Sequence, residues 1–547
     1  MTASASSLSV TPAAGGVQTV RRFITYALLA ATVIIAASGL SGLLDRLFTL
    51  NRIEVSYDNY GLATSLASAL VAGPLAALLW WLIWRDGTMA RDRASILWPV
   101  SLVVMSTVAL LVFTIALFSW IADTIRYGWN PAGLAIGIVW ALVWVWHYWM
   151  WQHPAKGPTR LQGAAPALAS LIGLTYGAGG LVSALAQLID AAADAGSRSV
   201  VVSDPLWQIV AQSLVWAIGG ALLWRWHWLR VGVRHHTFGF STVLLVFITG
   251  IASLAVFAFG LIILLSILLE LATGPQQPLA SLLDPLGSAI AGAAVAALVF
   301  TYHSRDVAER SAGVRAATSL ATAGVSLAFA ASGFGVTINA LLATSSDALL
   351  VGDIRSLLLA GLSALVVGGV LWWLTWRPLE ATEPQRVTTP GRRVYLVIIF
   401  GLSALVALIT LLVIGFQLFS FLLDGGSGES FVERSRQALG LLAATGLVAT
   451  YHFTIWRKDR ASDPDLGLEP THRISRVTLV SSGSNAELLE AVRTATGARV
   501  TVLQRAEPVT REPDVAAVVA ALEGVEASHV LLVAGAKGKV AVIPLVS

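Results

Sequence analysis

The chain has 547 residues, of which 56% are hydrophobic and only 12% are charged, and its mean hydropathy is +0.76. Soluble globular proteins carry about 25% charged residues, so the composition excludes an ordinary soluble chain and indicates an integral membrane protein. The absence of cysteine excludes disulfides, thiolate nucleophiles and cysteine-ligated metals. A formal net charge of +4 does not indicate nucleic-acid binding.

The first 19 residues are small and polar, and we expect them to be a disordered tail. Arg21 and Arg22 then precede an apolar run that ends near Ser38, a pattern shared with secretory and twin-arginine signals. The same start, RRVYLVIIFGLSALV, recurs at residues 392–406. We therefore interpret the run as the first membrane helix and not as a cleaved signal.

Apolar stretches of membrane-spanning length follow along the chain. A spanning helix needs about 20 mostly apolar residues. Twelve stretches meet or approach this length, at residues 23–44, 62–84, 96–122, 134–151, 165–189, 206–226, 243–269, 286–302, 316–340, 357–376, 394–423 and 438–455. The sequence predicts an all-α polytopic bundle of about twelve transmembrane helices.

The stretches pair into hairpins whose second helix ends in Trp, His and Arg. The endings are LLWWLIWRD (78–86), VWVWHYWMWQ (143–152), LLWRWHWLR (222–230), LVFTYHSRD (298–306), LWWLTWRP (371–378) and LVATYHFTIWRKD (447–459). Self-similarity at a fixed period indicates tandem copies of one unit. The predicted hairpin repeats span residues 20–92, 93–160, 161–232, 233–309, 310–390 and 391–460.

Loop charge predicts the orientation of the hairpins. Links between hairpins carry most loop cations, such as Lys156 and Arg234, whereas links within hairpins are richer in acids. Excess Lys and Arg marks the cytoplasmic side, so both termini are expected in the cytoplasm. The preference for Arg over Lys and the abundance of Ala indicate a bacterial protein, and we expect the inner or plasma membrane as its location.

Four histidines, His147, His227, His303 and His452, recur in the aromatic endings. One interpretation is haem or metal ligation, since imidazole is a good ligand. The favoured interpretation is an interfacial belt, because Trp and Tyr flanked by Arg anchor helices at membrane surfaces. The belt would contain Trp80, Trp84, His147, Trp151, Trp226, His227, Trp228, His303, Trp372, Trp376, His452 and Trp456.

Small and acidic residues recur within the repeats. The segment AASGLSGLLD at 36–45 matches AASGFGVTIN at 330–339, so Asp45 and Asn339 fall in register. Glycines inside the spans are expected at helix–helix contacts. The acids near the outer helix ends are either a cation-attracting vestibule or simply helix ends at the water boundary, and we favour the second. These acids are Asp123, Asp190, Glu270 and Asp424.

Catalytic motifs are absent from the sequence. It contains no HExxH, GxSxG or Walker sequence, and charge is nearly absent in the middle of the spans. Because ion pumps and proton-coupled transporters need intramembrane charge, the sequence disfavours them. A facilitator for a neutral or apolar solute remains open.

A polar linker at residues 461–472 precedes a segment, 473–547, with soluble character. Strands are expected at 475–482, 498–505, 528–535 and 539–546, and helices at 485–496 and 515–523. A capping box at residues 484–487 opens the first helix. The order βαβαββ predicts a small cytosolic α/β domain.

The paired helices, the starts RRF…Y (residues 21–26) and RRVY (392–395), and the W-H/Y-W…R endings resemble an uncharacterised family of bacterial multi-pass membrane proteins, a domain of unknown function. The resemblance implies tandem copies over about residues 20–460 and no known activity, cofactor or site residue.

The leading functional hypothesis is a non-enzymatic membrane scaffold or sensor. The bundle would contact the lipid bilayer, and the C-terminal domain would bind a cytosolic protein partner. The alternatives are a facilitator for a neutral or apolar solute and, third, a haem- or metal-binding redox protein. No catalytic, cofactor or metal residue is assigned from the sequence.

Overall fold

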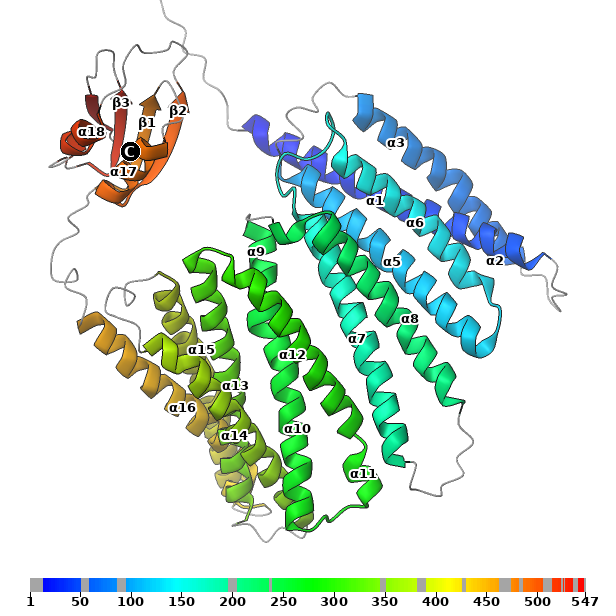
Figure 1. Cartoon of the computed structure of the whole chain (residues 1–547), viewed down its shortest axis with the longest axis vertical. Coiled ribbons are helices and arrows are strands. Elements are labelled where there is room, and N and C mark those ends of the chain that lie inside the picture. The colour runs from blue at the N-terminus through cyan, green and yellow to red at the C-terminus, as the bar shows by residue number, and fades with distance from the viewer. Residues whose placement is uncertain are drawn as a thin grey trace, which may run out of the picture. The chain divides into compact units, whose positions relative to one another are not determined.

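The computed structural model describes residues 13–50, 59–85, 95–194, 204–235, 239–344, 351–380, 390–425, 429–461, 474–481, 486–504, 514–522, 525, 527–534 and 540–545. The chain divides into two compact units, Met1–Phe453 and Thr454–Ser547. The first contains nearly all of the helical bundle and the second contains a small sheet (Figure 1).

Within the described residues, twelve helical segments are long and apolar enough to cross a membrane, which confirms the predicted bundle. They are formed by α1 (Ala13–Thr49); α2 (Asn59–Ala67), η1 (Ser68–Ala72) and α3 (Gly73–Arg85); α5 (Leu97–Tyr127); α6 (Pro131–Gln152); α7 (Ala164–Asp194); α8 (Leu206–Arg225) and η2 (Trp226–Arg230); α9 (Gly239–Val246), η4 (Phe247–Ala252) and α10 (Ser253–Thr273); α11 (Leu279–Leu283) and α12 (Leu286–Ala308); α13 (Ala312–Ala343); α14 (Val351–Glu380); α15 (Pro390–Leu423); and α16 (Phe431–Ala461). Helix α1 begins at Ala13, inside the expected N-terminal tail, while residues 1–12 lie outside the described residues.

The two spans of each of the first five hairpins pack against each other, and α15 and α16 of the sixth meet through the rings of Phe400 and Phe453. Four spans in succession form a group. The first group contains α1, α2–α3, α5 and α6; the second contains α7, α8, α9–α10 and α12; the third contains α13 to α16 (Figure 1). The first helix of each group contacts both the second and the fourth: α1 packs on α3 and α6, and α7 on α8 and α12. In the third group, α13 packs on α14, and Gly335 of α13 lies against Gly440 of α16.

Several of the glycines inside the spans lie at close contacts between helices, as expected from the sequence, whereas a Cβ at Gly369 would meet nothing within 4 Å. A Cβ at Gly39 would overlap Ser68 and Ala69 of the second span, and a Cβ at Gly333 would overlap the backbone of Leu365 in α14. Lipid tails are as apolar as leucine, so helices associate in membranes chiefly through such close contacts. Gly39 and Gly333 are in register in the matching segments 36–45 and 330–339. The first and third groups therefore both have a close contact between their first and second spans at this glycine.

The second unit contains a four-stranded sheet and two helices, which confirms the predicted α/β domain. Its elements are β1 (Arg476–Ser481), α17 (Ala486–Thr496), β2 (Arg499–Gln504), α18 (Val515–Leu522), β3 (His529–Ala534) and β4 (Val540–Leu545). The strand order is β2-β1-β3-β4, with β1 parallel to both neighbours and β3–β4 an antiparallel hairpin. The expected capping residues Ser484 and Asn485, the hairpin turn at 536–538 and the linker after Ala461 lie outside the described residues.

Candidate functional site

The four histidines of the aromatic endings are buried. His147, His227, His303 and His452 are each at most 3% exposed. In each of them Nδ1 lies 2.7–2.9 Å from the carbonyl oxygen of the residue four positions earlier, namely Val143, Leu223, Val299 and Val448. A carbonyl oxygen can only accept, so Nδ1 carries a proton in each of these contacts, and Nε2 is the other polar atom of the ring.

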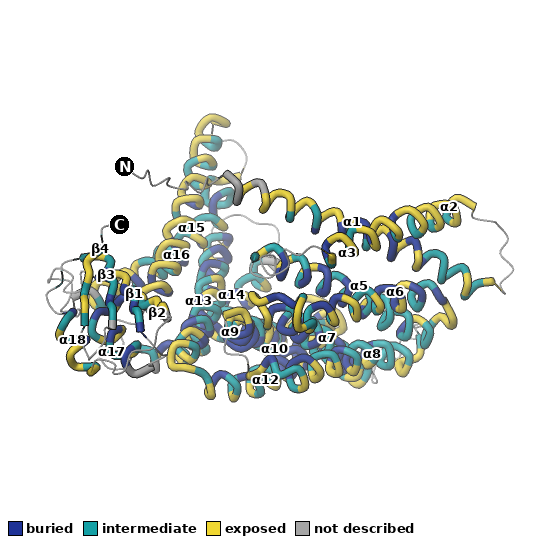
Figure 2. Tube along the Cα trace, turned by 90° about the horizontal axis from the view of Figure 1, so that it is seen from above, coloured by how far each residue is buried: buried dark blue, intermediate teal, exposed yellow. Residues whose placement is uncertain are grey.

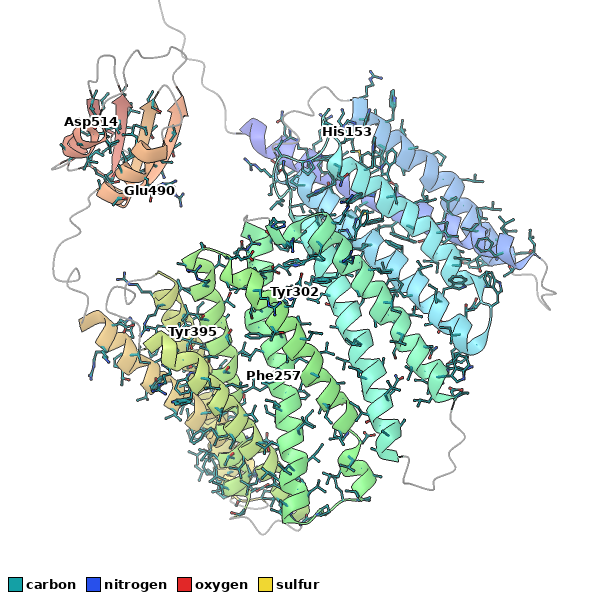
Figure 3. The ribbon with its side chains drawn as sticks, in the orientation of Figure 1. His153, Phe257, Tyr302, Tyr395, Glu490 and Asp514 are labelled. Atoms are coloured by element: carbon teal, nitrogen blue, oxygen red, sulfur yellow. The ribbon has the colours of Figure 1, made fainter. Side chains whose placement is uncertain are left out.

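Each histidine on a fourth helix packs against a tryptophan from the second span of its own group. The ring centroids of Trp80 and His147 are 6.0 Å apart, those of Trp224 and His303 are 6.0 Å apart, and those of Trp376 and His452 are 5.9 Å apart. The same construction therefore recurs in three groups. Tyr302 and Tyr395 extend the clusters of the second and third groups (Figure 3).

The structure does not bring the histidines to one shared point. Each of the three fourth-helix histidines is enclosed by the rings of its own group, and His227 packs on Trp144 of α6. Among the described residues, no group of three or more His, Asp or Glu side chains has the arrangement of a metal site. The arrangement required by the shared-ligand interpretation is not found in the described part of the chain.

The expected interfacial belt is only partly at the surface. Trp226 and Trp456 are exposed, but Trp228 and Trp376 are buried along with the histidines. Packing between helices explains the difference. Trp228 donates from Nε1 to Asp306, and Trp376 donates from Nε1 to the hydroxyl of Tyr451 at 2.9 Å. These rings are core residues of the bundle, a role that their position in the sequence did not reveal.

The acids near the helix ends make specific contacts. The Asp190 carboxylate accepts from the backbone N–H of Gly287 at 3.0 Å, and Glu270 accepts from the Ser356 hydroxyl at 2.7 Å. Asp424 pairs with Arg434 at 2.9 Å. Asp123 lines a cavity of about 360 Å³ between α5 and α6. Three of the four acids thus make hydrogen bonds or ion pairs near helix ends, which favours the structural interpretation over a vestibule.

A groove of about 540 Å³ lies among α13, α15 and α16 in the third group. We call it the α13–α16 groove. Its lining is mostly apolar, with Ser332, Ser403 and Thr445 along its length and Asn339 and Gln437 at one end. Small-molecule sites typically have volumes of about 300–1,000 Å³ and combine an apolar lining with a few polar groups. The α13–α16 groove therefore has the size and lining of a binding site.

The groove lies between two predicted hairpins, because α13 belongs to the fifth and α15 and α16 to the sixth. Sequence reasoning missed it. Apart from Asn339 and Gln437, its lining residues are Ala, Gly, Ser, Thr, Leu, Val and Ile, which any packed membrane helix also uses. The one available signal was the contrast between tryptophan in IVWALVWVWHY, residues 138–148, and small residues in AATGLVATYHF, residues 443–453.

Two segments of the chain match the family model of a domain of unknown function, DUF5671, at residues 22–131 and 320–451. The two matched segments are consistent with tandem copies of this domain. The first match covers most of α1 and continues through α5, and the second covers most of α13 to α16, including every residue that lines the α13–α16 groove. No curated protein and no solved structure is similar enough to the chain to count as a match.

The DUF5671 match confirms the resemblance seen in the sequence and supports a multi-pass membrane protein. The family description names no activity. Both matched segments end before the histidine of their fourth helix, since Tyr451 precedes His452 and Pro131 precedes His147. The matched part thus includes the groove but not these two imidazoles.

Proposed function

We propose that the protein is a non-enzymatic scaffold or sensor of the bacterial inner or plasma membrane, with both termini in the cytoplasm. In this proposal the helical bundle is the anchor, and the C-terminal domain binds a cytosolic protein partner. The observation that carries it is a sheet face of the C-terminal domain that neither helix of this domain covers.

Helices α17 and α18 pack on one face of the sheet only. The core consists of alternate strand residues, such as Val477, Leu479 and Leu532, together with Leu488 and Val518 of the helices. Successive strand residues point to opposite faces. The other face therefore carries Val480, Leu503, Leu531, Val533, Ile543 and Leu545.

This uncovered face is apolar in its middle and basic at one end. Leu503 is 52% exposed and Ile543 is 44% exposed. Arg499, Arg476 and His529 are register partners on adjacent strands, so they form one row across β2, β1 and β3. The four strands contain no Asp or Glu. Apolar surface with cations at its border fits a partner surface that has an apolar stripe and flanking acids.

The test is capture of crosslinked partners by the full-length protein. The variant Leu503→Asp/Ile543→Asp and the charge reversal Arg476→Glu/Arg499→Glu should each lose the bound partner. Ala517→Asp, on the exposed side of α18, is the matched control and should retain it. If a variant without residues 462–547 retains the same partners, the scaffold proposal is wrong.

Orientation is tested separately by reporter fusions. Fusions after Lys156, Arg234 and Lys458 should all report a cytoplasmic location, since these sites lie in or next to cation-rich segments. A periplasmic signal at any of them contradicts the proposed topology.

The second candidate, a facilitator for a neutral or apolar solute, is favoured by the α13–α16 groove, which lies between two hairpins and has hydroxyls along its length. It predicts that reconstituted protein accelerates glycerol equilibration across vesicles. The scaffold predicts no change against empty vesicles.

A further inference from the structure

The α13–α16 groove has the form of a channel for one long chain. Its lining residues on α13 run from Gly324 to Asn339. At 1.5 Å per residue this separation corresponds to about 22 Å along the helix axis. The groove is therefore long compared with its volume, as a site for an extended chain must be.

The groove opens sideways along much of its length. Leu402 of α15 and Leu441 of α16 line it, yet they are 56% and 47% exposed. Helix α15 carries exposed apolar residues over much of its length (Figure 2). Both helices are membrane-spanning segments, so the medium along this opening is the hydrocarbon of the bilayer.

The two ends of the groove differ in chemistry. At the inner end, the Tyr395 ring lies 3.5 Å from where a Cβ of Gly324 would be, so the aromatic cluster closes the channel. At the outer end, Asn339 and Gln437 contribute amide groups, and Arg436 donates to Asn339 Oδ1 at 3.0 Å. An apolar channel with hydrogen-bonding groups at one end matches an amphiphile whose polar group lies at the membrane surface.

In the first group a large side chain fills the space that corresponds to the groove. The groove therefore depends on which side chains the third group has at these positions. Trp140 lies seven residues before His147, and Thr445 lies seven residues before His452. Trp140 is buried with Ala37, Ala109 and Val139 between α1, α5 and α6. At the corresponding place in the third group, Thr445 lines the groove.

We propose that the α13–α16 groove binds one acyl chain of a bilayer phospholipid, with the ester region of that lipid at Asn339 and Gln437. The phospholipid is the committed occupant because the groove opens into the bilayer, where acyl chains are the surrounding medium. The ester carbonyls need donors, which the two amide side chains supply. This site does not depend on the C-terminal domain or on the proposed scaffold function.

The test uses the full-length protein in vesicles that contain phosphatidylcholine with a photoactivatable diazirine in the middle of one acyl chain. After irradiation, peptide mapping should place adducts on the lining residues of α13, α15 and α16. The variant Thr445→Trp, which copies the first group, should lose most of them. Leu447→Trp, on the exposed side of α16, is the matched control and should retain them.

The reverse variant keeps the test decisive if Thr445→Trp does not fold. Trp140→Thr should produce new adducts in the first group, between α1, α5 and α6. Adducts spread evenly over the lipid-facing surface, or adducts unchanged in Thr445→Trp, overturn the proposal. A parallel sample with diazirine-labelled palmitic acid separates the two sources of an acyl chain: labelling of the groove by the free acid alone also overturns it.

Discussion

In the first four-helix group, the indole of Trp140 occupies the space between α1, α5 and α6. In the third group, Thr445 lines a groove of about 540 Å³. The two groups otherwise share the close contact at Gly39 or Gly333 and the buried imidazole bonded to the carbonyl four residues earlier. A repeated scaffold can thus keep its helix contacts while one position decides whether its interior is packed or open.

The two groups also differ in the packing energy that this position contributes. A buried tryptophan contributes through its large apolar area and its many contacts. A threonine contributes little apolar area, and its hydroxyl bonds to Leu441 of its own helix at 2.8 Å. The third group therefore gives up packing energy at this position, which a bound acyl chain would restore.

The largest expected effect is that of Trp140→Thr. It removes a buried indole and should destabilise the first group by about 3–5 kcal/mol, the range for truncating large buried side chains. The measurement is thermal unfolding in detergent. Trp207→Thr, at a residue that is 63% exposed, is the matched control and should change stability little. Equal losses in the two variants would mean that Trp140 is not a core residue.

The next effect comes from the shared glycines. Gly39→Ala and Gly333→Ala each place a methyl group into the neighbouring helix, so each should cost about 1–3 kcal/mol through overpacking. Gly369→Ala, where a Cβ would meet nothing within 4 Å, is the control and should be neutral or slightly stabilising. A loss of stability in only one of the two variants would contradict the proposed register between the first and third groups.

Replacing the buried imidazoles should have a smaller effect. His147→Phe and His452→Phe keep most of the ring volume but lose the Nδ1 donation to Val143 and Val448. A hydrogen bond contributes about 0.5–1.5 kcal/mol, so both variants should lose about this much stability. His235→Phe, outside the spans, serves as the control. A much larger loss in one variant would indicate that its Nε2 has a further role.

The smallest effect is expected at the end of the groove where Asn339 lies. Arg436 bonds to Asn339 and pairs with Glu433 at 2.9 Å, whereas Pro131 stands at the equivalent place before His147. Partly exposed ion pairs contribute about 0.2–1 kcal/mol. Arg436→Gln should therefore lower stability by no more than this, and the loss should shrink at high salt. A salt-independent loss above this range would point to a buried electrostatic role.

Hydropathy and periodicity were sufficient to predict the twelve spans, because a membrane helix must satisfy its own backbone hydrogen bonds over a length that the bilayer sets. The order of strands and helices in the C-terminal domain followed from alternation in segments such as RVTLVS and from Gly497 at the end of α17. The glycine contacts also followed from the sequence, since residues 36–45 and 330–339 place Gly39 and Gly333 in register. In each case the physical cause acts within one helix, one strand or one short motif.

The tertiary structure decided which side chains meet. The sequence placed Trp228, Trp376 and the histidines at helix ends, where an interfacial role was the natural expectation. Packing against the neighbouring helices of the same group buries them, and neighbours from distant parts of the chain cannot be read from one helix. The α13–α16 groove has the same origin. Thr445, Ser332 and Ser403 are ordinary residues of separate helices, and they line a site only because α13, α15 and α16 enclose a space that none of them fills.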